Sequence, residues 1–474
     1  MAKIKSNTLH KIGNKLFKYM YKNPERNMLR IIKIAKSVAG GMYPKGTFET
    51  PIDIVSNKNN IWHDYLFNGL KDVDERVLTR AILTFGIDAG YVGTSTLRAK
   101  RDELHINIPW VILLDPTSAC NLKCKGCWAA EYGYKSNLTL DEMRKLISEA
   151  KELGTHFFMF TGGEPLVRKE DILTLVRENQ DCIFLAYTNG TLVDQKFCKD
   201  MKEAGNLALA LSIEGTRETT DARRGEGVYD KVMEAMRLLK ENKCLFGTSV
   251  CYTSQNYEAV TSDEFYDMEI EMGAKFAWYF HYMPVGAGAD TELLLTPEQR
   301  EHVYRAIREK RNSKTGKPIF TVDFQNDGEF VGGCIGGGRN YFHVNSEGDV
   351  EPCVFIHYSD SNIREKSVLE CLRSPLFFEY YKGQPFNDNM LRPCPMLENP
   401  EKLQALVKRA GAKSTNLIQP ESAEELCAKC EVYAKNWAPK AKNIWEEKER
   451  FKPYTQYWRD TPEGKAELAK QNQE

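Results

Sequence analysis

The sequence predicts an α/β protein built around a partial (βα)6 barrel of the TIM type, with a helical N-terminal region and a small cysteine-rich C-terminal module. Strand-like and helix-like segments alternate regularly between residues 106 and 312, which is typical of parallel strands joined by helical crossovers. Residues 1–105 show helical periodicity instead. After residue 313 the alternation gives way to loops with spaced cysteines, and residues 436–474 return to a polar helical pattern. We therefore expect four parts: 1–105, 106–312, 313–435 and 436–474.

The N-terminal part is basic and amphipathic. Residues 1–45 contain eleven lysines and arginines and a single acid, Glu25, while apolar residues such as Ile12 and Leu16 recur between them at roughly helical spacing. This pattern is typical of a helix that lies on a membrane or binds an acidic partner. It is also typical of a helix packed on a core with a solvated basic face. The first interpretation predicts a peripheral membrane contact through residues 1–36.

The composition argues against several classes of function. A formal net charge of −1 over 474 residues does not favour nucleic-acid binding. No segment is long and apolar enough to span a membrane, and no secretory signal pattern opens the chain. Thirteen cysteines are too sparse and irregular for a small disulfide scaffold. We therefore expect a cytoplasmic protein that uses some of its cysteines for other chemistry.

The barrel is predicted from six strand–helix pairs, because β-branched and aromatic runs alternate with segments of helical period. Ligands of such sheets bind at the carboxyl ends of the strands, where the motifs described below fall. The expected strands are 110–114, 156–160, 182–187, 207–213, 245–252 and 275–282. The expected helices are 140–153, 169–178, 194–204, 229–240, 263–272 and 297–310.

Three cysteines follow the first predicted strand with the spacing Cys-x3-Cys-x2-Cys: Cys120, Cys124 and Cys127. They are one thiolate short of the four that usually hold an iron–sulfur cube, so one iron would stay open for a reactive ligand. Structural zinc is one alternative, although such sites normally have four protein ligands. Three buried, unliganded cysteines are the other alternative.

A glycine-rich turn, Phe160-Thr-Gly-Gly-Glu-Pro165, ends the second predicted strand. Gly162 and Gly163 would allow a ligand to approach the backbone closely, and Glu164 offers a carboxylate to an ammonium group. A plain tight turn before a helix is the alternative. Taken with the cysteine loop, this turn resembles the radical S-adenosylmethionine (SAM) superfamily over about residues 108–290.

The resemblance implies a [4Fe–4S] cluster on the three cysteines, with its fourth iron chelated by the amino and carboxylate groups of SAM. It also implies that the Gly-Gly-Glu-Pro turn meets the SAM amino group. One position departs from the family, because Gly126 stands where an aromatic residue usually precedes the third cysteine, and Trp128 follows it. Helix capping and surface pairing are the alternative roles of the polar residues that match. The implied cofactor-binding residues are Gly162, Gly163, Glu164, Thr188, Asn189, Ser212, Glu214, Arg224 and, beside the adenine, Met283 or Val285.

The cysteine-rich module resembles the SPASM and twitch extensions of the same superfamily, which carry auxiliary iron–sulfur clusters. Cys334, Gly348 and Cys353 match the opening of their pattern, and residues 343–353 are expected to form a β-hairpin around a Glu-Gly turn. The pattern is cut short after Cys430, which predicts one auxiliary cluster, with or without a single-iron site; zinc is the alternative. We expect metal rather than a large core to hold the module. The predicted ligands are Cys334, Cys353, Cys394, Cys427 and Cys430, and the predicted packing cysteines are Cys182, Cys198, Cys244, Cys251 and Cys371.

The resemblance implies an enzyme that reductively cleaves SAM to a 5′-deoxyadenosyl radical and abstracts hydrogen from an unactivated C–H, forming a new C–C, C–S or C=C bond. It further implies an electron donor such as ferredoxin or flavodoxin, and a reducing, anaerobic cell. No general base stands out from the sequence. The candidates are Asp323, Asp327 and Glu329 in the loop between the two domains.

The substrate is predicted from the N-terminal part of the chain. Its basic amphipathic pattern favours a lipid or another apolar substrate and weakly resembles superfamily members that join lipid hydrocarbon chains. A ribosomal peptide or protein is the second hypothesis, although residues 1–100 lack the strands of the winged-helix domain that usually binds such peptides. A non-catalytic iron–sulfur electron-transfer protein is the third.

Overall fold

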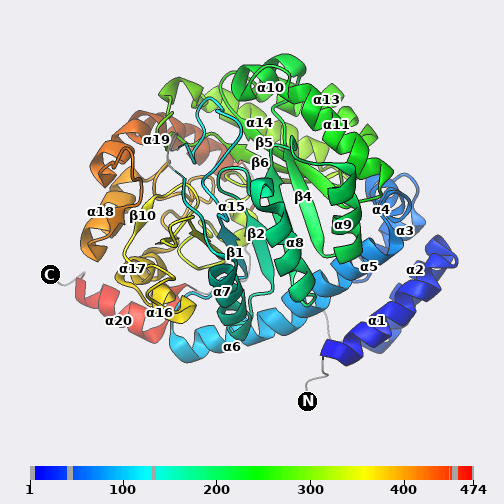
Figure 1. Cartoon of the computed structure of the whole chain (residues 1–474). Helices are drawn as coiled ribbons and strands as arrows, with labels where there is room; N and C mark the ends of the chain where they lie inside the picture. Colours follow the sequence, from blue (N-terminus) through cyan, green and yellow to red (C-terminus); the bar gives the residue numbers. More distant parts are fainter. Residues whose placement is uncertain (1–5, 40–45, 131–134, 448, 451–456, 472–474) are drawn as a thin grey trace.

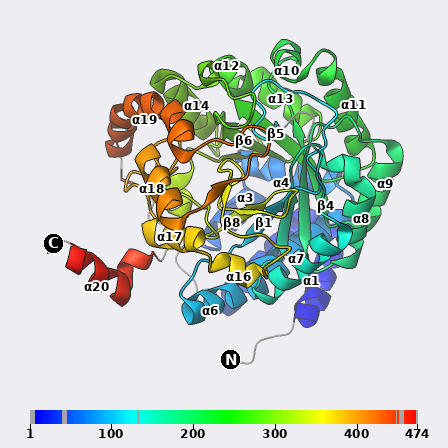
Figure 2. The same ribbon diagram turned by 60° about the vertical axis from the view of Figure 1, so that its left-hand side comes forward.

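The computed structural model describes residues 6–39, 46–130, 135–447, 449–450 and 457–471, and Figures 1 and 2 give two views of the chain. Its strands are β1 Val111–Leu114, β2 Phe157–Phe160, β3 Ile183–Thr188, β4 Leu207–Ser212, β5 Phe246–Tyr252, β6 Phe276–His281, β7 Phe320–Asp323, β8 Tyr341–Val344, β9 Val350–Glu351, β10 Tyr358–Ser359 and β11 Lys413–Ser414. The first six occupy the positions predicted from the sequence, within one residue at each end.

The central sheet has nine strands in the order β7-β6-β5-β4-β3-β2-β1-β8-β9. All neighbours are parallel except β8 and β9, which form the antiparallel hairpin predicted for the module. That hairpin pairs directly with the barrel, because Val111 of β1 lies opposite Tyr341 of β8. The sequence predicted a separate module, whereas the structure joins the barrel and the module in one sheet. The predicted α/β fold class is confirmed.

Helices cover the outside of the barrel, as the predicted crossovers require. Thr139 begins α7 and Thr296 begins α14 with reciprocal capping boxes, which satisfy backbone donors at the helix start. In the barrel region the helices are α7 Leu140–Glu152, η3 Pro165–Arg168, α8 Lys169–Glu178, α9 Gln195–Ala204, α10 Arg217–Arg224, α11 Val228–Glu241, α12 Tyr257–Thr261, α13 Asp263–Glu271, η4 Thr291–Leu293 and α14 Pro297–Lys310.

Several C-terminal helices group on one side of the barrel, opposite α8, α9 and α11 (Figures 1 and 2): α17 Pro375–Gly383, α18 Pro400–Ala410, α19 Ala423–Glu446 and α20 Pro462–Gln471. The other helices of this part are α15 Gly328–Val331, α16 Val368–Leu372 and η5 Trp458–Asp460. The expectation that metal replaces a core in this module is wrong, because Leu376, Leu391 and Leu397 are completely buried there. The boundary expected at residue 435 falls inside α19.

The N-terminal region is helical, as predicted: α1 Ser6–Tyr21, α2 Pro24–Ala39, α3 Glu49–Ser56, α4 Ile61–Asp72, α5 Glu75–Leu83, η2 Thr84–Gly93 and α6 Thr94–Leu104. Helix α1 is fixed to η2 by Ser6 and His10, which bond Asp88 at 2.6 and 2.7 Å. Its outer face nevertheless leaves Ile12 and Leu16 exposed. None of the helices within the described ranges combines the length and apolar character needed to cross a lipid bilayer.

Candidate active site

A cavity of about 210 Å³ opens at the carboxyl ends of the barrel strands. The cysteine loop and the glycine turn form one end of it, and side chains of the module form the other. The loop cysteines Cys120, Cys124 and Cys127 all line this cavity. The structure therefore brings the first two sequence motifs together, as expected for the strand ends of a parallel barrel.

The loop cysteines do not have the close spacing of a tetrahedral zinc site. Tetrahedral zinc with Zn–S bonds of about 2.3 Å requires sulfurs about 3.8 Å apart. No three of the chain's cysteine sulfurs, all of which lie in the described residues, are within 4.8 Å of one another. Burial raises the pKa of Cys120 to about 11, so a cationic group is needed to hold this thiol as a thiolate. These residues fit an iron–sulfur cluster.

The two glycines of the turn are required by the backbone of the cysteine loop. Gly162 has φ +103°, and a Cβ at this position would lie 2.6 Å from the carbonyl oxygen of Thr117. A Cβ at Gly163 would overlap the carbonyl oxygen of Ala119. The amide of Gly163 donates to Thr117 O at 3.0 Å. The turn therefore supports the cysteine loop as well as lining the cavity.

Glu164 has an internal role in addition to its position at the cavity. Its carboxylate accepts hydrogen bonds from Thr188 Oγ1 at 2.6 Å, from the Asn189 amide at 2.8 Å and from the Leu166 amide at 3.0 Å. Burial raises its pKa above the ordinary value. The side chain thus ties the end of β3 to the turn, and Thr188 and Asn189 line the cavity beside it.

Two adjacent arginines bring positive charge to the cysteine loop. Arg223 and Arg224 line the cavity, and Arg224 Nη1 lies 4.0 Å from Cys124 Sγ. Glu214 lies behind them, fully buried, and accepts from Arg223 at 2.6 Å and from Arg224 Nε at 2.8 Å. Glu214 does not line the cavity, although it was predicted to bind the cofactor, whereas Arg223 lines it without having been predicted. Its signal was its place beside Arg224 in the same element.

The position that departs from the family pattern has no room for a side chain. A Cβ at Gly126 would lie 2.7 Å from Cε2 of Tyr282, and the Tyr282 ring lines the cavity there. Trp128 faces the module instead, with its ring 5.8 Å from His343 and 6.1 Å from Phe355. The aromatic ring next to the third cysteine therefore comes from Tyr282, which is far from it in the sequence.

The remaining predicted positions divide between the cavity and its surroundings. Ser212 and Met283 line the cavity, whereas Val285 is buried outside its lining. Cys251, predicted to be a packing residue, also lines the cavity, together with Ser249. No sequence motif marks Cys251 or Ser249. Whether a residue at the end of a strand lines the cavity depends on the register of that strand with its neighbours, which a single segment of sequence does not reveal.

The three acids considered as general bases do not line the cavity. Asp323 accepts from Tyr252 Oη at 2.9 Å, and Asp327 accepts from Arg311 at 2.8 and 2.7 Å. Glu329 pairs with Arg308. Each carboxylate is committed to a partner in the fold, so the structure gives no support to a role in proton transfer.

Two cysteines of the module, Cys334 and Cys353, lie just behind the far wall of the cavity. Ile335 and Val354, which directly follow Cys334 and Cys353, line it. Cys394 Sγ accepts two backbone N–H groups at 3.4 Å, an arrangement that suits a thiolate ligand. Cys427 and Cys430 lie one helical turn apart on α19.

Tyr380 gives a separate indication that the module holds a sulfur-containing group. Its hydroxyl is buried and has no hydrogen-bond partner among the described residues. Burial, and then the charges of Cys334, Cys353 and Cys394, raise its pKa well above the ordinary value. A buried donor left unpaired is costly, and the sulfide of a cluster held by these cysteines would accept from it. The module residues therefore fit an auxiliary iron–sulfur cluster.

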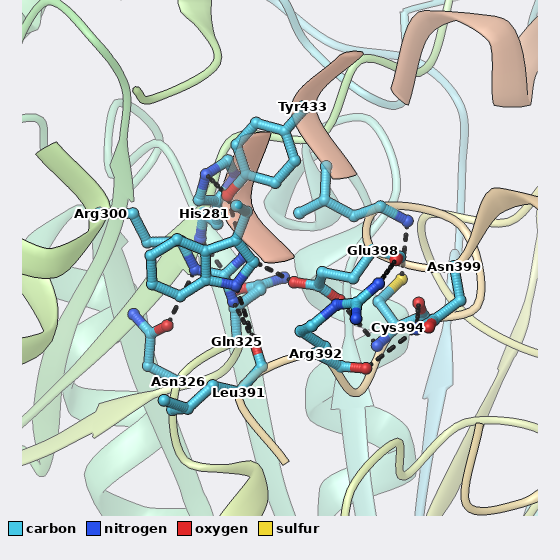
Figure 3. A network of polar contacts seen from close by, with 12 residues as sticks. His281, Arg300, Gln325, Asn326, Leu391, Arg392, Cys394, Glu398, Asn399 and Tyr433 are labelled. Atoms are coloured by element: carbon cyan, nitrogen blue, oxygen red, sulfur yellow. Dashed lines mark hydrogen bonds and ion pairs between the residues drawn. The ribbon is translucent and has the colours of Figure 1, made fainter. Parts of the chain in front are cut away.

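A buried polar network connects the cavity to the module (Figure 3). Arg300 and Glu398, both fully buried, pair at 2.7 Å, and Glu398 accepts the amide of Cys394 at 2.8 Å. Arg300 also donates to Tyr433 Oη at 2.8 Å, and that hydroxyl lies 2.9 Å from Nε2 of the cavity residue His281. Burial and the Arg300 charge lower the pKa of His281 to about 3. The imidazole is therefore neutral and accepts from Tyr433.

Comparisons with known proteins agree with this geometry. A family profile described as the radical SAM superfamily matches residues 114–263. An AdoMet-dependent heme synthase of Methanosarcina barkeri is 29% identical over 293 residues, covering 56% of this chain and 82% of that protein. A PqqA peptide cyclase of Bradyrhizobium diazoefficiens is 26% identical over 258 residues, covering 52% of this chain and 67% of that protein.

Solved structures share the fold. Streptococcus suis SuiB bound to S-adenosylmethionine aligns with a TM-score of 0.52 at 19% identity, covering 70% of this chain and 80% of that one. The same protein bound to its precursor peptide SuiA aligns with a TM-score of 0.52 at 20% identity, covering 71% of this chain and 79% of that one. At these identities the likeness concerns the fold alone.

Proposed function

Because this chain is an enzyme of the radical SAM superfamily, we propose that it forms a new C–C, C–S or C=C bond on a lipid or another apolar substrate. The fold implies SAM and a [4Fe–4S] cluster. When bound and reduced, the cluster supplies the cleavage of SAM to methionine and a 5′-deoxyadenosyl radical, which takes hydrogen from an unactivated C–H. The protein holds, orients and shields the reactants.

The loop end of the cavity is suited to SAM. Cys120, Cys124 and Cys127 would hold the cluster, and Arg224 would bind the SAM carboxylate, a role supported by the contact of its guanidinium with Cys124. Arg223 adds a second positive charge at the same end. A guanidinium bonds carboxylates strongly and with a fixed geometry. We assign the SAM amino group to the turn at Gly163 and Glu164.

The apolar far wall of the cavity is the observation that carries the substrate proposal. Beyond the loop end, the lining consists mainly of apolar and aromatic side chains such as Trp278, Phe280 and Phe355. Within the described residues, the acidic and basic side chains that line the cavity are Glu164, Arg223 and Arg224, apart from the neutral His281. A charged substrate group at the far wall would lose its hydration without gaining a partner. A hydrocarbon chain gains about 0.8 kcal/mol for each CH2 buried.

The module would hold an auxiliary cluster on Cys334, Cys353 and Cys394, close behind the wall that contacts the substrate. Cys427 and Cys430 form a further pair of thiols on α19. A ferredoxin or flavodoxin would supply the electron for SAM cleavage. A metal group in this place is suited to bind the substrate or to accept an electron from it.

The proposed membrane contact uses α1 and α2. Ile12, Leu16 and Ile34 are exposed there, and the lysines and arginines of this region outnumber the acids. Apolar side chains between cations favour an anionic lipid surface. We therefore place the enzyme at the inner membrane face, where its apolar substrate would be available.

A peptide or protein is the second candidate substrate. It is supported by the similarity to a PqqA peptide cyclase and by the fold shared with SuiB, which binds the peptide SuiA. Aromatic walls would also suit an apolar peptide side chain. Against this candidate, the described part of residues 1–100 is helical and contains no strand.

The origin of the abstracted hydrogen distinguishes the two candidates. The reconstituted enzyme, incubated anaerobically with SAM, a reductant and vesicles of chain-deuterated phospholipid, is expected to release deuterated 5′-deoxyadenosine, measured by mass spectrometry. Vesicles deuterated only in the headgroup are the control. Undeuterated 5′-deoxyadenosine from both preparations would contradict the lipid proposal and favour the peptide.

Membrane binding is tested separately by flotation with anionic vesicles. Each lysine or arginine near the surface contributes about 1 kcal/mol, so binding should weaken as salt rises. Deletion of residues 1–36 should release the enzyme, whereas Ile12→Ser with Ile34→Ser should weaken binding with every charge retained. If the full-length chain ignores anionic vesicles at low salt, the membrane contact is wrong.

A further inference from the structure

Tyr341 separates the cavity from a cysteine of the module. It begins β8, where its backbone pairs with Val111 of β1, and its ring lines the cavity. Its hydroxyl oxygen lies 2.6 Å from Cys353 Sγ. One side chain therefore contacts both the space assigned to the substrate and a sulfur assigned to the auxiliary cluster.

The fold holds this contact in place. Tyr341 is 2% exposed, so water does not compete for its hydroxyl. Its ring packs edge-on against Phe324, with centroids 6.0 Å apart, and the backbone is fixed by the β1–β8 pairing. A cysteine bound to metal is a thiolate and can only accept. With metal bound, the Tyr341 hydroxyl is therefore the donor and the Cys353 sulfur the acceptor.

We propose that Tyr341 raises the reduction potential of the auxiliary cluster by donating this hydrogen bond to Cys353. Reduction adds negative charge to a cluster, and a hydrogen bond to a ligand sulfur stabilises that charge. The reduced form is then more populated at a given solution potential. Tyr341 acts here as a positioning residue, through Cys353. The inference rests on the auxiliary cluster proposed above.

The test uses the full-length chain carrying Cys120→Ala, Cys124→Ala and Cys127→Ala, so that the module provides the iron–sulfur signal. Tyr341→Phe is added, and the cluster is titrated with reductant while its electron paramagnetic resonance signal is recorded. The ratio of reduced to oxidised cluster at a fixed potential should fall about tenfold, which is a shift of about −59 mV for a one-electron couple. Tyr187→Phe is the matched control, because it removes a hydroxyl that lines the same cavity and whose contact is Met159 Sδ at 3.9 Å.

A second variant covers the case in which Tyr341→Phe disturbs the fold. A fluorinated tyrosine at position 341 keeps the ring and makes the hydroxyl a stronger donor, so the potential should move in the positive direction. An iron cluster whose potential is unchanged in both variants would overturn the role of Tyr341 alone. If no iron cluster assembles in the parent, with cobalt or zinc bound instead, the auxiliary cluster of the proposed function fails as well.

Discussion

The two ends of the cavity use opposite solutions to the problem of burying reactive groups. At the loop end, two arginines lie beside the cysteines, the carboxylate of Glu214 lies behind them, and that of Glu164 lies in the glycine turn. At the module end, the buried Arg300 is paired with Glu398 and surrounded by Tyr433 and Trp437. Charged side chains thus line the cavity at the first end, whereas at the second end they are enclosed and paired behind it. The first end is suited to a charged cofactor, and the second to a neutral, apolar substrate beside an enclosed metal group.

The largest effect is expected from replacing the loop cysteines. Replacing Cys120, Cys124 and Cys127 together by alanine should remove about four irons per chain and abolish SAM cleavage, because the cluster loses all of its protein ligands. Iron analysis and 5′-deoxyadenosine quantification measure both losses. Retained cleavage would contradict the assignment of this end to SAM.

The buried ion pair of the module end is expected to contribute strongly to folding. Arg300→Met leaves Glu398 buried without its partner and should lower the free energy of unfolding by about 3–5 kcal/mol. Combining it with Glu398→Gln removes the unpaired charge and should recover part of the loss. Denaturant unfolding of the two variants measures the difference. Equal stability of Arg300→Met and the wild type would show that the Arg300–Glu398 pair is not needed to balance the buried charge at this end.

His343 lies in β8, the strand that joins the module to the barrel, and should make the free energy of unfolding depend on pH. Its ring lies between Asp115 and Glu351, at 2.9 and 2.6 Å. Although burial lowers its pKa, the two carboxylates outweigh burial and raise it to about 10. A raised pKa stabilises the fold fully below the unfolded value of about 6.5 and loses this effect as pH rises through 10.

Between those two pH values the contribution of His343 should decline by an amount on the order of 4 kcal/mol. Denaturant unfolding at pH 7 and pH 10 measures it. His343→Gln, which does not titrate, is the control and should flatten the profile over this interval. A wild-type profile as flat as that of the variant would contradict the buried imidazolium.

A smaller effect, on the affinity for SAM, is expected at Glu164 in the loop end. Glu164→Gln keeps the shape of the side chain but removes its charge, and should weaken SAM binding by roughly 1.5–3 kcal/mol. Thr188→Val removes the hydroxyl bonded to Glu164 without changing any charge, and shows how much of the loss comes from that internal hydrogen bond. Calorimetry with the reconstituted enzyme measures both affinities. Equal SAM affinity in the wild type and Glu164→Gln would leave the carboxylate with its internal role alone.

The sequence predicted those parts of the site that local motifs encode. The six barrel strands, the cysteine loop and the glycine turn follow from periodicity and spacing, because each lies within a short segment. The contact between Tyr282 and Gly126 joins residues far apart in the chain, as does the pair Arg300–Glu398. No periodic signal marks either one. The pairing of β8 with β1 was missed for the same reason, since a register between distant strands is decided by packing.

We propose that SAM is cleaved at the loop end of the cavity and that the product forms at the module end. The most direct test is to replace Cys334 and Cys353 by alanine and to quantify 5′-deoxyadenosine and modified substrate in the same anaerobic reaction. Continued formation of 5′-deoxyadenosine with no modified substrate is the predicted result. Loss of SAM cleavage in this variant, while the loop cluster still holds its iron, would contradict the separation of the two ends.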